Sequence, residues 1–223
     1  MSALVVITGT SRGIGLALAE KFVQEGFTVI GTSRTGKVES LNHPQFSVLP
    51  LDLTDLSSIK SFADTLKEKE IFADIFINNA GIGPDLDTLI PEIDSFQQTL
   101  AVNLTGTVFL TEQILSRIKK KGKILNISSK MGSVEFCVGT DSPAYRLSKA
   151  ALNMYTKILT NRLSSPQSVA AVHPGWVRTT ITKSCENGRL STKESASKIF
   201  EFALSSFSNG IFWNIETQST IPW

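Results

Sequence analysis

The sequence lacks the features on which several classes of protein depend. Only two cysteines, Cys137 and Cys185, occur among its 223 residues, in neither a C-x-x-C pair nor the spacing of metal ligands. A disulfide framework is thereby excluded, and we expect no bound metal. No stretch approaches the ~18 uncharged apolar residues of a membrane-spanning helix, and the first residues lack the basic segment that begins a secretion signal. We therefore expect a soluble, cytoplasmic protein without a membrane partner.

Charged residues are also scarce, at 19% of the chain, against about 25% in an average soluble domain. Lys and Arg number 22 and Asp and Glu 20, which gives a formal net charge of +2. Because the two signs are interspersed, no field of one sign attracts a polyanion, and we expect no nucleic-acid partner. The dense basic run is Lys119, Lys120, Lys121 and Lys123. We interpret it as the solvated C-terminal end of a helix.

What the chain has instead is an ordinary apolar content and a regular alternation of short and long segments. Hydrophobic residues make up 41% of the 223 residues, enough for a core that needs no disulfide or metal. Short β-branched runs alternate with longer segments of helical period, which is typical of βαβ units and a parallel sheet. The first run, Leu4–Ile7, is apolar at every position, as in a strand covered on both faces.

We expect further strands at 27–32, 46–51, 74–77, 123–127, 168–172 and 210–215. Helices are expected at 14–25, 55–69, 95–119, 144–162 and 192–205. No low-complexity linker interrupts the alternation. The sequence therefore predicts an α/β fold in which residues 1–223 form a single domain, a Rossmann-type doubly wound parallel sheet with helices on both faces.

Such sheets bind ligands outside the carboxyl ends of their strands. Just after six of the predicted strands stand polar residues, glycine or proline: Gly9, Arg34, Asp52, Asn78, Ser128 with Ser129, and Pro174 with Gly175. This clustering indicates that the loops at one edge of the sheet carry the function.

The first of these loops, residues 8–15, is rich in glycine and joins the first strand to the first helix. Glycines let the backbone approach a pyrophosphate, and the helix N-terminus supplies free N–H groups and the positive end of a dipole. The spacing is G-x-x-x-G-x-G, and a glycine turn can also be a tight connection and no more. Its place at the first turn of the chain favours a dinucleotide site.

The end of the second predicted strand indicates the type of dinucleotide. NAD binding usually needs an acidic residue there for the ribose 2′-hydroxyl, but residues 29–34 contain none and Glu39 comes too late. Arg34 and Arg12 are instead suited to flank a 2′-phosphate, with Ser33 and Thr32 as minor donors. We therefore expect NADP(H) rather than NAD(H).

Tyr145 and Lys149 lie four residues apart near the start of a predicted helix, and so on one face of it. A phenol has an ordinary pKa of ~10, so it acts as an acid or base near neutrality only when a nearby cation stabilises the phenolate. Lys149 is placed to do this. The spacing alone is a weak motif, and its weight comes from the other polar residues.

Three further polar features have both a functional and a structural interpretation. Ser128 and Ser129 end a predicted strand, where a hydroxyl either donates to a developing oxyanion or caps the strand end. Asn103 stands among apolar residues inside the predicted helix 95–119, as a functional amide or a locally bonded core residue. Residues 78–81, Asn-Asn-Ala-Gly, close a strand as a ligand contact or as a turn.

Together these residues resemble the short-chain dehydrogenase/reductase family over the range from Leu4 to at least Thr179. Six motifs follow in the family's order beside the T-G-x-x-x-G-x-G turn: Asp52-Leu53, Asn78-Asn79-Ala80-Gly81, Asn103, Ile127-Ser128-Ser129, Tyr145-x-x-x-Lys149 and Pro174-Gly175-Trp176-Val177-Arg178-Thr179. The resemblance implies about seven parallel strands in the order 3-2-1-4-5-6-7. It also implies hydride transfer between a nicotinamide and a carbonyl or alcohol.

The resemblance further implies the roles of individual residues. Tyr145 is expected to be the general acid/base, and Lys149 to lower its pKa and hold the nicotinamide ribose. Ser129 is expected to orient the substrate, with Ser128 as the other possibility, and Asn103 to support a water-linked proton relay to the lysine. These two, with Tyr145 and Lys149, form the expected catalytic set.

The expected cofactor residues, besides Tyr145 and Lys149, come from five strand ends: Gly9, Thr10, Ser11, Arg12, Gly13, Ile14, Gly15, Ser33, Arg34, Asp52, Leu53, Asn79, Ala80, Gly81, Pro174, Val177 and Thr179. By resemblance, Asp52, Leu53 and Asn79 are contacts on the adenosine side. Val177 and Thr179 are contacts to the nicotinamide carboxamide.

Two departures from the family's pattern concern the substrate. The interval from Ser129 to Tyr145 is longer than usual, so loop 130–143, which carries Phe136, is expected to wall the pocket. The segment 180–190, a lid helix in many members, is short and polar, and the pocket is therefore expected to be open. The expected pocket residues are Ser129, Phe136 and Trp176.

The leading hypothesis is an NADP(H)-dependent carbonyl reductase that acts on a small carbonyl or alcohol. The sequence looks most like the carbonyl-reductase branch that contains the C-factor and sniffer proteins. Two alternatives stay open: a 3-oxoacyl carrier-protein reductase, and a C-factor-like NADP-binding protein of signalling or redox sensing. The resemblance also allows a homodimer or homotetramer, paired through helices 95–119 and 144–162 or through the last strand.

Overall fold

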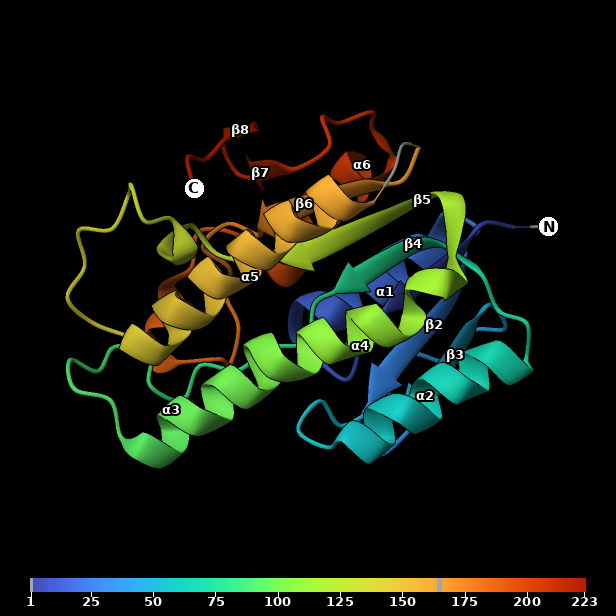
Figure 1. Ribbon diagram of the computed structural model, residues 1–223, viewed down its shortest axis with the longest axis horizontal. Coiled ribbons are helices and arrows are strands. Elements are labelled where there is room, and N and C mark those ends of the chain that lie inside the picture. The colour runs from blue at the N-terminus through green and yellow to red at the C-terminus, as the bar shows by residue number, and fades with distance from the viewer. Residues whose placement is uncertain (1, 164–165) are drawn as a thin grey trace.

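The computed structural model describes residues 2–163 and 166–223, and its centre is one twisted sheet (Figure 1). The strands are β1 (Leu4–Ile7), β2 (Thr28–Ser33), β3 (Phe46–Pro50), β4 (Ala73–Asn78), β5 (Ile118–Ile127), β6 (Ser168–His173), β7 (Ile211–Asn214) and β8 (Ser219–Thr220). The α-helices are α1 (Gly13–Gln24), α2 (Leu56–Glu68), α3 (Ile93–Leu100), α4 (Thr107–Ile114), α5 (Pro143–Arg162) and α6 (Thr192–Leu204).

The strand order confirms the expected doubly wound fold. The sheet runs β3-β2-β1-β4-β5-β6-β7-β8, and the first seven strands are parallel. The order reverses between β1 and β4, where such sheets bind their ligands. An eighth strand was not expected: β8 is a two-residue antiparallel edge strand, formed by the pairs Trp213 with Thr220 and Asn214 with Ser219. A strand this short leaves too little sequence pattern to be foreseen.

Helices cover both faces of the sheet and divide the core into two layers. In Figure 1, α2, α4 and α5 lie in front of the sheet, and α1 and α6 lie behind it. Leu18, Phe22 and Ile199 belong to the core behind the sheet, and Phe62, Leu110 and Leu152 to the core in front. Alternate residues of the strands enter the two layers, so the strands must be apolar on both faces. This is why their sequences read as continuous apolar runs.

The helix predicted at 95–119 is wrong in extent. The chain forms α3, then the π-helical turn η1 (Ala101–Gly106), α4, and a short 3-10 turn, η2 (Leu115–Arg117), before it enters β5 at Ile118. Strand β5 thus begins five residues before the predicted start at 123. The helical period misses these changes because a π turn keeps helical backbone angles while its hydrogen bonds skip one residue further.

The interpretation of the lysine run as a helix C-terminus is wrong as well. Residues 119–123 lie within β5, where Lys119 pairs with Asp74 at 2.8 Å. Lys123 Nζ donates to the carbonyl oxygens of Ala203 and Ser205, at 2.8 and 2.7 Å, and so closes the C-terminal end of α6. A lysine of this run does stabilise a helix C-terminus, but the helix is α6, which lies about 80 residues farther along the chain.

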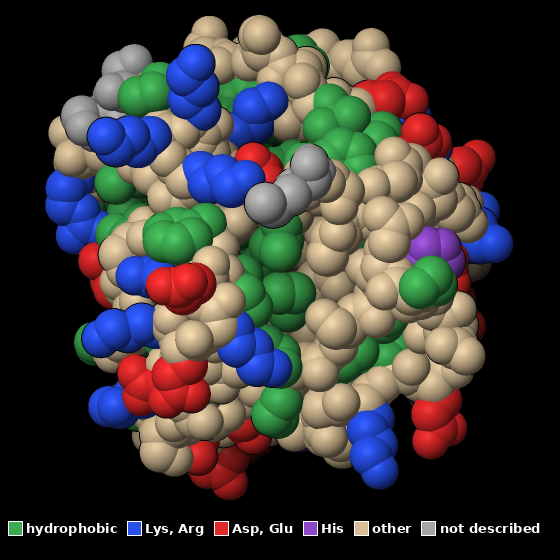
Figure 2. Space-filling model, turned by 90° about the vertical axis from the view of Figure 1, so that its right-hand side faces the viewer, with side chains coloured by type: hydrophobic (Ala, Val, Ile, Leu, Met, Phe, Trp, Pro, Cys, Tyr) green, Lys and Arg blue, Asp and Glu red, His purple; other side chains and the backbone are tan. Residues whose placement is uncertain are grey.

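Figure 2 faces the end of the molecule at which the strands begin. Lys and Arg side chains spread over one half of this face with Asp and Glu among them, so the face carries both signs of charge. The lysines at the start of β5 lie at this end, opposite the carboxyl ends of the strands. Within the described residues, no helix is long and apolar enough to cross a membrane.

Candidate active site

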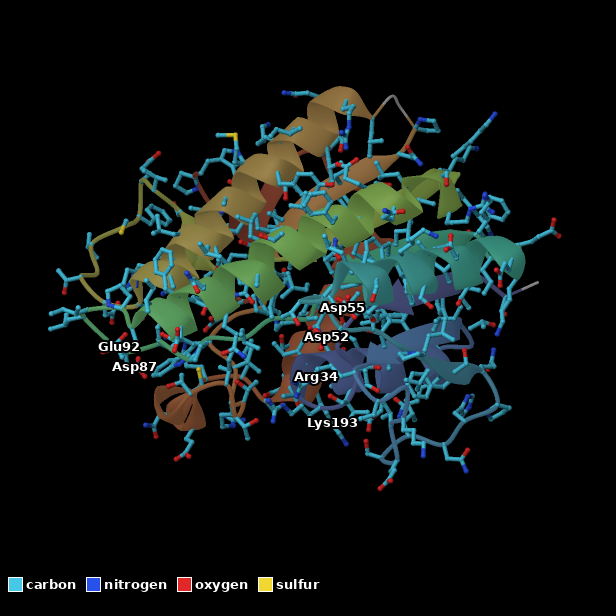
Figure 3. All side chains as sticks on the ribbon, turned by 60° about the horizontal axis from the view of Figure 1, so that its bottom comes forward. Arg34, Asp52, Asp55, Asp87, Glu92 and Lys193 are labelled. Atoms are coloured by element: carbon cyan, nitrogen blue, oxygen red, sulfur yellow. The ribbon has the colours of Figure 1, made fainter. Side chains whose placement is uncertain are left out.

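A cavity of about 1180 Å³ lies along the carboxyl ends of the strands. It runs from the loop after β3, which provides Asp52, past the reversal point between β1 and β4, to Tyr145 and Trp176. Figure 3 shows Arg34 and Asp52 at this edge, with Asp87 and Glu92 farther along it. The expected cofactor residues that line it are Gly9, residues 11–15, Ser33, Arg34, Asp52, Leu53, residues 79–81, Tyr145, Pro174, Val177 and Thr179.

The turn after β1 packs so closely against its own backbone and Ala80 that Gly9 and Gly15 leave no space for a side chain. Gly9 has φ +71°, and a Cβ atom there would lie 2.9 Å from the Cα atom of Ala80. At Gly15, a Cβ atom would lie 2.1 Å from the carbonyl oxygen of Gly9. Asn79 holds the turn, since its Nδ2 donates to the oxygens of Thr8 and Gly9 at 2.9 and 3.2 Å. The turn is therefore a compact cradle at the N-terminus of α1, as phosphate binding requires.

Thr10 is the member of this turn that does not face the cavity. Its side chain is fully buried, and its hydroxyl donates to the carbonyl oxygen of Thr32 at 3.2 Å. The residue thus ties the turn to β2. A sequence pattern cannot separate such a tie from a ligand contact, because both lie in the same loop.

The cavity end near β2 and β3 holds two exposed guanidinium groups and one carboxylate, that of Asp52, which is hydrogen-bonded within its own loop. Arg12 and Arg34 are exposed and line the cavity. Ser33 Oγ donates to the carbonyl oxygen of Lys37 at 2.9 Å, and Asp52 Oδ1 accepts the Thr54 N–H at 2.9 Å. The two guanidinium groups are therefore the cations of this end that are placed for an anion.

At the other end, Tyr145 and Lys149 lie on the first turns of α5. Lys149 is 4% exposed, its Nζ donates to the carbonyl oxygen of Ile127 at 2.9 Å, and it lies 5.5 Å from the centre of the Tyr145 ring. Burial lowers the pKa of Lys149 to about 8. Burial also raises the pKa of Tyr145 to about 12, aided by nearby Cys185 and opposed by a hydrogen bond with Ser129. The result is a protonated phenol beside a buried cation.

The sequence left open whether Ser128 or Ser129 is the catalytic hydroxyl, and the structure gives the two side chains different partners. Ser128 is buried, and its hydroxyl donates to Asn153 Oδ1 at 2.6 Å, inside the contact between β5 and α5. Ser129 Oγ accepts the N–H of Met131 at 3.2 Å and is within hydrogen-bonding reach of Tyr145. The hydroxyl beside the phenol is therefore that of Ser129.

Asn103 lies in the π-helical turn η1, is 1% exposed and does not line the cavity. Its Oδ1 accepts the N–H of Ile82 at 2.8 Å, and its Nδ2 donates to the carbonyl oxygen of Ile82 at 2.8 Å. The same Nδ2 also reaches Ser148 Oγ at 3.2 Å. Asn103 thus joins the loop after β4 to α5, behind Tyr145 and Lys149.

The predicted substrate residues are not all brought together. Trp176 and Ser129 line the cavity, whereas Phe136 is 56% exposed and lies outside it. Of loop 130–143, only Lys130 and Met131 reach the cavity. Farther along, the loop is tied to the C-terminal residues, since Ser133 Oγ donates to the carbonyl oxygen of Pro222 at 2.7 Å and the Glu135 N–H donates to that of Trp223 at 3.2 Å.

Several cavity residues were missed by the sequence patterns. The chief ones are Ile82, Gly83 and Leu86 from the loop after β4, His173 at the end of β6, and Cys185 from the segment after Thr179. His173 carried a signal, because it directly precedes Pro174 at a strand end. The loop after β4 carried none, since apolar residues and glycine in a connection have no period that points to a cavity.

The sequence comparisons place this geometry among known proteins. The family described as short chain dehydrogenase matches residues 3–189. The curated 3-oxoacyl-[acyl-carrier-protein] reductase FabG of Vibrio harveyi is 32% identical over 187 residues, which are 81% of this chain and 75% of that protein.

Two of the solved structures that cover the whole chain are carbonyl reductases by name. The NADPH-bound carbonyl reductase from chicken fatty liver has a TM-score of 0.85 at 27% identity, with 100% of each chain covered. The carbonyl reductase Sniffer of Drosophila melanogaster has a TM-score of 0.88 at 24% identity, also with 100% of each chain covered, a likeness that shows the fold alone. These matches confirm the expected resemblance to carbonyl reductases.

Proposed function

This chain belongs to the short chain dehydrogenase family, whose members are NAD(P)-dependent oxidoreductases, and we propose that it is an NADP(H)-dependent carbonyl reductase. The observation that carries the proposal is the meeting of Tyr145 and Ser129 at one end of the large cavity, with the buried Lys149 beside the Tyr145 ring. The likeness to the NADPH-bound carbonyl reductase from chicken fatty liver supports both the cofactor and the reaction.

The residues along the cavity suit a dinucleotide with a 2′-phosphate. The cradle at Gly9 and Gly15 is closed to any Cβ atom and lies at the N-terminus of α1, where a pyrophosphate is stabilised by the helix dipole. Arg12 and Arg34 are the guanidinium groups for the 2′-phosphate, since such forks bind phosphate in two places at once. Asp52 and Leu53 line the neighbouring end as the adenosine contacts, and Val177 and Thr179 line the nicotinamide end.

In the proposed reaction, bound NADPH supplies the hydride that reduces a carbonyl carbon to an alcohol. Tyr145 donates its phenolic proton to the carbonyl oxygen as negative charge develops there. The raised pKa of Tyr145, about 12, keeps the proton on the phenol until the substrate is bound. Ser129, whose hydroxyl lies beside the phenol, donates a hydrogen bond to the same oxygen and orients it.

Lys149 makes this proton transfer favourable. Its buried ammonium lies below the Tyr145 ring and stabilises the phenolate that remains after the proton has left. Its hydrogen bond to the carbonyl oxygen of Ile127 fixes its position. The proton relay through Asn103 and water that the family resemblance implies stays a prediction, as do the oligomeric state and the cytoplasmic location.

The proposal is tested by NADPH oxidation with a panel of aldehydes, diketones, quinones and 3-oxoacyl thioesters. Tyr145→Phe should lower kcat by about 10²- to 10⁴-fold and leave NADPH binding unchanged. Full turnover in this variant would refute the role of Tyr145. Absence of turnover on every substrate, together with tight NADPH binding, would favour the sensing function instead.

The choice of NADP(H) is tested separately at Arg34. Arg34→Ala should weaken NADPH binding by about 10- to 100-fold and change NADH binding far less. Arg117→Ala is the matched control, because Arg117 lies over the Phe72 ring at the start of β5, away from the cavity. Equal kcat/KM for NADPH and NADH in the parent protein would contradict the proposal.

A 3-oxoacyl carrier-protein reductase remains the second candidate, because the Vibrio harveyi relative has this activity in its name. An acidic carrier protein needs a basic surface at the cavity mouth, and the lysines of β5 lie at the opposite end of the sheet. A kcat/KM that is much higher for a carrier-protein thioester than for the free thioester would favour this candidate.

A further inference from the structure

Helix α5, which carries Tyr145, begins without a cap of its own. Its N-cap residue, Ser142, has left-handed backbone angles (φ 56°, ψ 45°), and its side chain caps no N–H of the helix. The first turn of a helix leaves up to four N–H groups without an intrahelical partner. Pro143 has no N–H, and the Arg146 N–H reaches the carbonyl oxygen of Ser142 at 3.0 Å. The two donors left to satisfy are those of Ala144 and Tyr145.

Both donors point at one carboxylate from a distant part of the chain. Asp85 Oδ2 accepts the N–H of Ala144 at 2.9 Å and the N–H of Tyr145 at 3.4 Å. Asp85 lies in the loop between β4 and α3 and is 1% exposed. A buried negative charge is stabilised here because it meets the positive end of the α5 dipole. Asp85 therefore acts as the N-terminal cap of α5.

The loop that carries Asp85 is fixed to the same helix start by further bonds. The Asp87 N–H donates to Ser142 Oγ at 3.0 Å, and the Ser142 N–H donates to the carbonyl oxygen of Thr88 at 2.7 Å. Thr88 Oγ1 in turn donates to the carbonyl oxygen of Asp85 at 2.7 Å. These bonds hold the backbone of the loop against the start of α5 and so keep the Asp85 side chain within reach of the helix.

The same loop and helix also enclose the Tyr145 side chain and its carbonyl group. A Cβ atom on Gly83 would lie 3.3 Å from Cδ2 of the Tyr145 ring. On the other side, Ser148 Oγ donates to the carbonyl oxygen of Tyr145 at 2.8 Å and accepts from Asn103 Nδ2 at 3.2 Å. The backbone of Tyr145 is therefore held at its N–H by Asp85 and at its carbonyl by Ser148.

We propose that Asp85 is a positioning residue for the reaction: by capping the first turn of α5 it holds the Tyr145 phenol in line with Ser129 and Lys149. The inference rests on the proposed function, in which Tyr145 gives the proton. It assigns no contact between Asp85 and substrate or cofactor. A displacement of a proton donor by about 1 Å is enough to slow a reaction by about 100-fold, so a cap can control turnover without touching the substrate.

The kinetic test compares Asp85→Ala, which removes the acceptor, with Asp85→Asn, which keeps an oxygen in its place. We expect Asp85→Ala to lower kcat by about 10- to 100-fold with little change in the Kd for NADPH, and Asp85→Asn to restore most of the loss. Asp55→Ala is the matched control, because Asp55 caps α2 through the Ser57 N–H at 2.8 Å and lies outside the cavity. Its kcat should equal that of the parent protein.

A second measurement does not depend on activity. The chain has two tyrosines, Tyr145 and Tyr155, so ¹³C-labelled tyrosine gives two NMR signals, which Tyr155→Phe assigns. We expect the Tyr145 signal to move in Asp85→Ala and to stay in place in Asp55→Ala. Should Asp85→Ala fail to fold, Ser142→Ala, which frees the loop from the helix start, should move the same signal.

The outcomes separate this inference from the proposed function. An unmoved Tyr145 signal in Asp85→Ala, or an equal loss of kcat in Asp85→Asn or Asp55→Ala, would overturn the role of Asp85. Failure of the parent protein to reduce any carbonyl would overturn the proposed function, while a shifted Tyr145 signal would still support the cap.

Discussion

At the scale of single residues, burial acts on the two key groups in opposite directions. It raises the pKa of Tyr145 to about 12 and lowers the pKa of Lys149 to about 8, so each group is driven toward its neutral form. The reason is the same in both cases, since an ion loses its hydration when it is buried. The lysine is thus the group of the pair that changes its charge at a pH near neutrality.

This difference predicts the pH dependence of the enzyme. Below pH 8 Lys149 is charged and Tyr145 keeps its proton, whereas above pH 8 the cation is lost while Tyr145 is still a phenol. We therefore expect kcat/KM for NADPH to fall as the pH rises through about 8. A profile that stays level to about pH 10, the ordinary range of lysine, would contradict the assignment.

His173 predicts a dependence of stability on pH. Burial lowers its pKa to about 4, and its Nδ1 has no hydrogen-bond partner within the described residues. In the unfolded chain His173 takes up a proton near pH 6.5, but in the folded chain it does so only near pH 4. Stability due to this group is therefore present above pH 6.5 and lost as the pH falls through this window, by about 3 kcal/mol in all.

The measurement is the free energy of unfolding in urea between pH 4 and pH 7. In His173→Gln the free energy of unfolding should fall much less over this pH range than in the parent protein. His43→Gln is the matched control, since His43 is the other histidine of the chain and is less buried. An equal acid loss in the parent protein and in His173→Gln would disprove the prediction.

At the scale of elements, the π-helical turn η1 decides the shape of the site. It turns Asn103 toward the backbone of Ile82 and joins α3 to α4 without a loop. The extra residue of a π turn frees a carbonyl group, and Thr107 Oγ1 donates to that of Val102 at 3.1 Å. The turn ends at Gly106, which packs against the loop that carries Leu53.

Gly106 therefore couples helix packing to the loop at Leu53, which lines the cavity. A Cβ atom there would lie 2.0 Å from the carbonyl oxygen of Leu53 and 2.7 Å from its Cβ atom. We expect Gly106→Ala to destabilise the fold by about 1–3 kcal/mol and to weaken NADPH binding, because Leu53 lines the cavity beside Asp52.

Gly122→Ala is the matched control for this prediction. A Cβ atom on Gly122 would lie 2.9 Å from the carbonyl oxygen of Lys119, but this crowding is in the first half of β5, far from the cavity. The control should lower the melting temperature and leave the Kd for NADPH unchanged. An unchanged Kd in Gly106→Ala would show that η1 does not position the loop at Leu53.

At the scale of the whole molecule, one sheet serves both core layers and the cavity. The two larger core clusters lie on opposite faces of the same strands, and the cavity lies along the common edge of these strands. No separate unit is needed for the substrate, because Trp176, Ile82 and Cys185 all come from loops at this edge. That residues 1–223 form a single domain stays a prediction.

That prediction can be tested by unfolding. The three tryptophans, Trp176, Trp213 and Trp223, lie in the last quarter of the chain, whereas far-UV circular dichroism reports on all helices. We expect the two signals to give one coincident urea transition. Saturating NADPH, at 100 times its Kd, should add about 2.7 kcal/mol to the free energy of unfolding. Separate transitions would mean that the two halves of the chain fold independently.

The sequence by itself determined the seven parallel strands apart from the start of β5, the glycine turn, and the pairing of Tyr145 with Lys149. The reason is that each depends on local rules: an apolar run for a strand covered on both faces, glycine where no side chain fits, and a four-residue spacing on one face of a helix. The order of the strands followed from family resemblance, and the structure confirms it.

The tertiary structure alone decided which residues these elements meet. It moved the lysine run into β5, left Phe136 outside the cavity, and set Ser129 rather than Ser128 beside the phenol. It also brought Asp85 to the start of α5, a contact that spans 59 residues of sequence. Such contacts have no period or spacing, because they form only when distant segments pack together, and a sequence pattern records only what neighbours in the chain require.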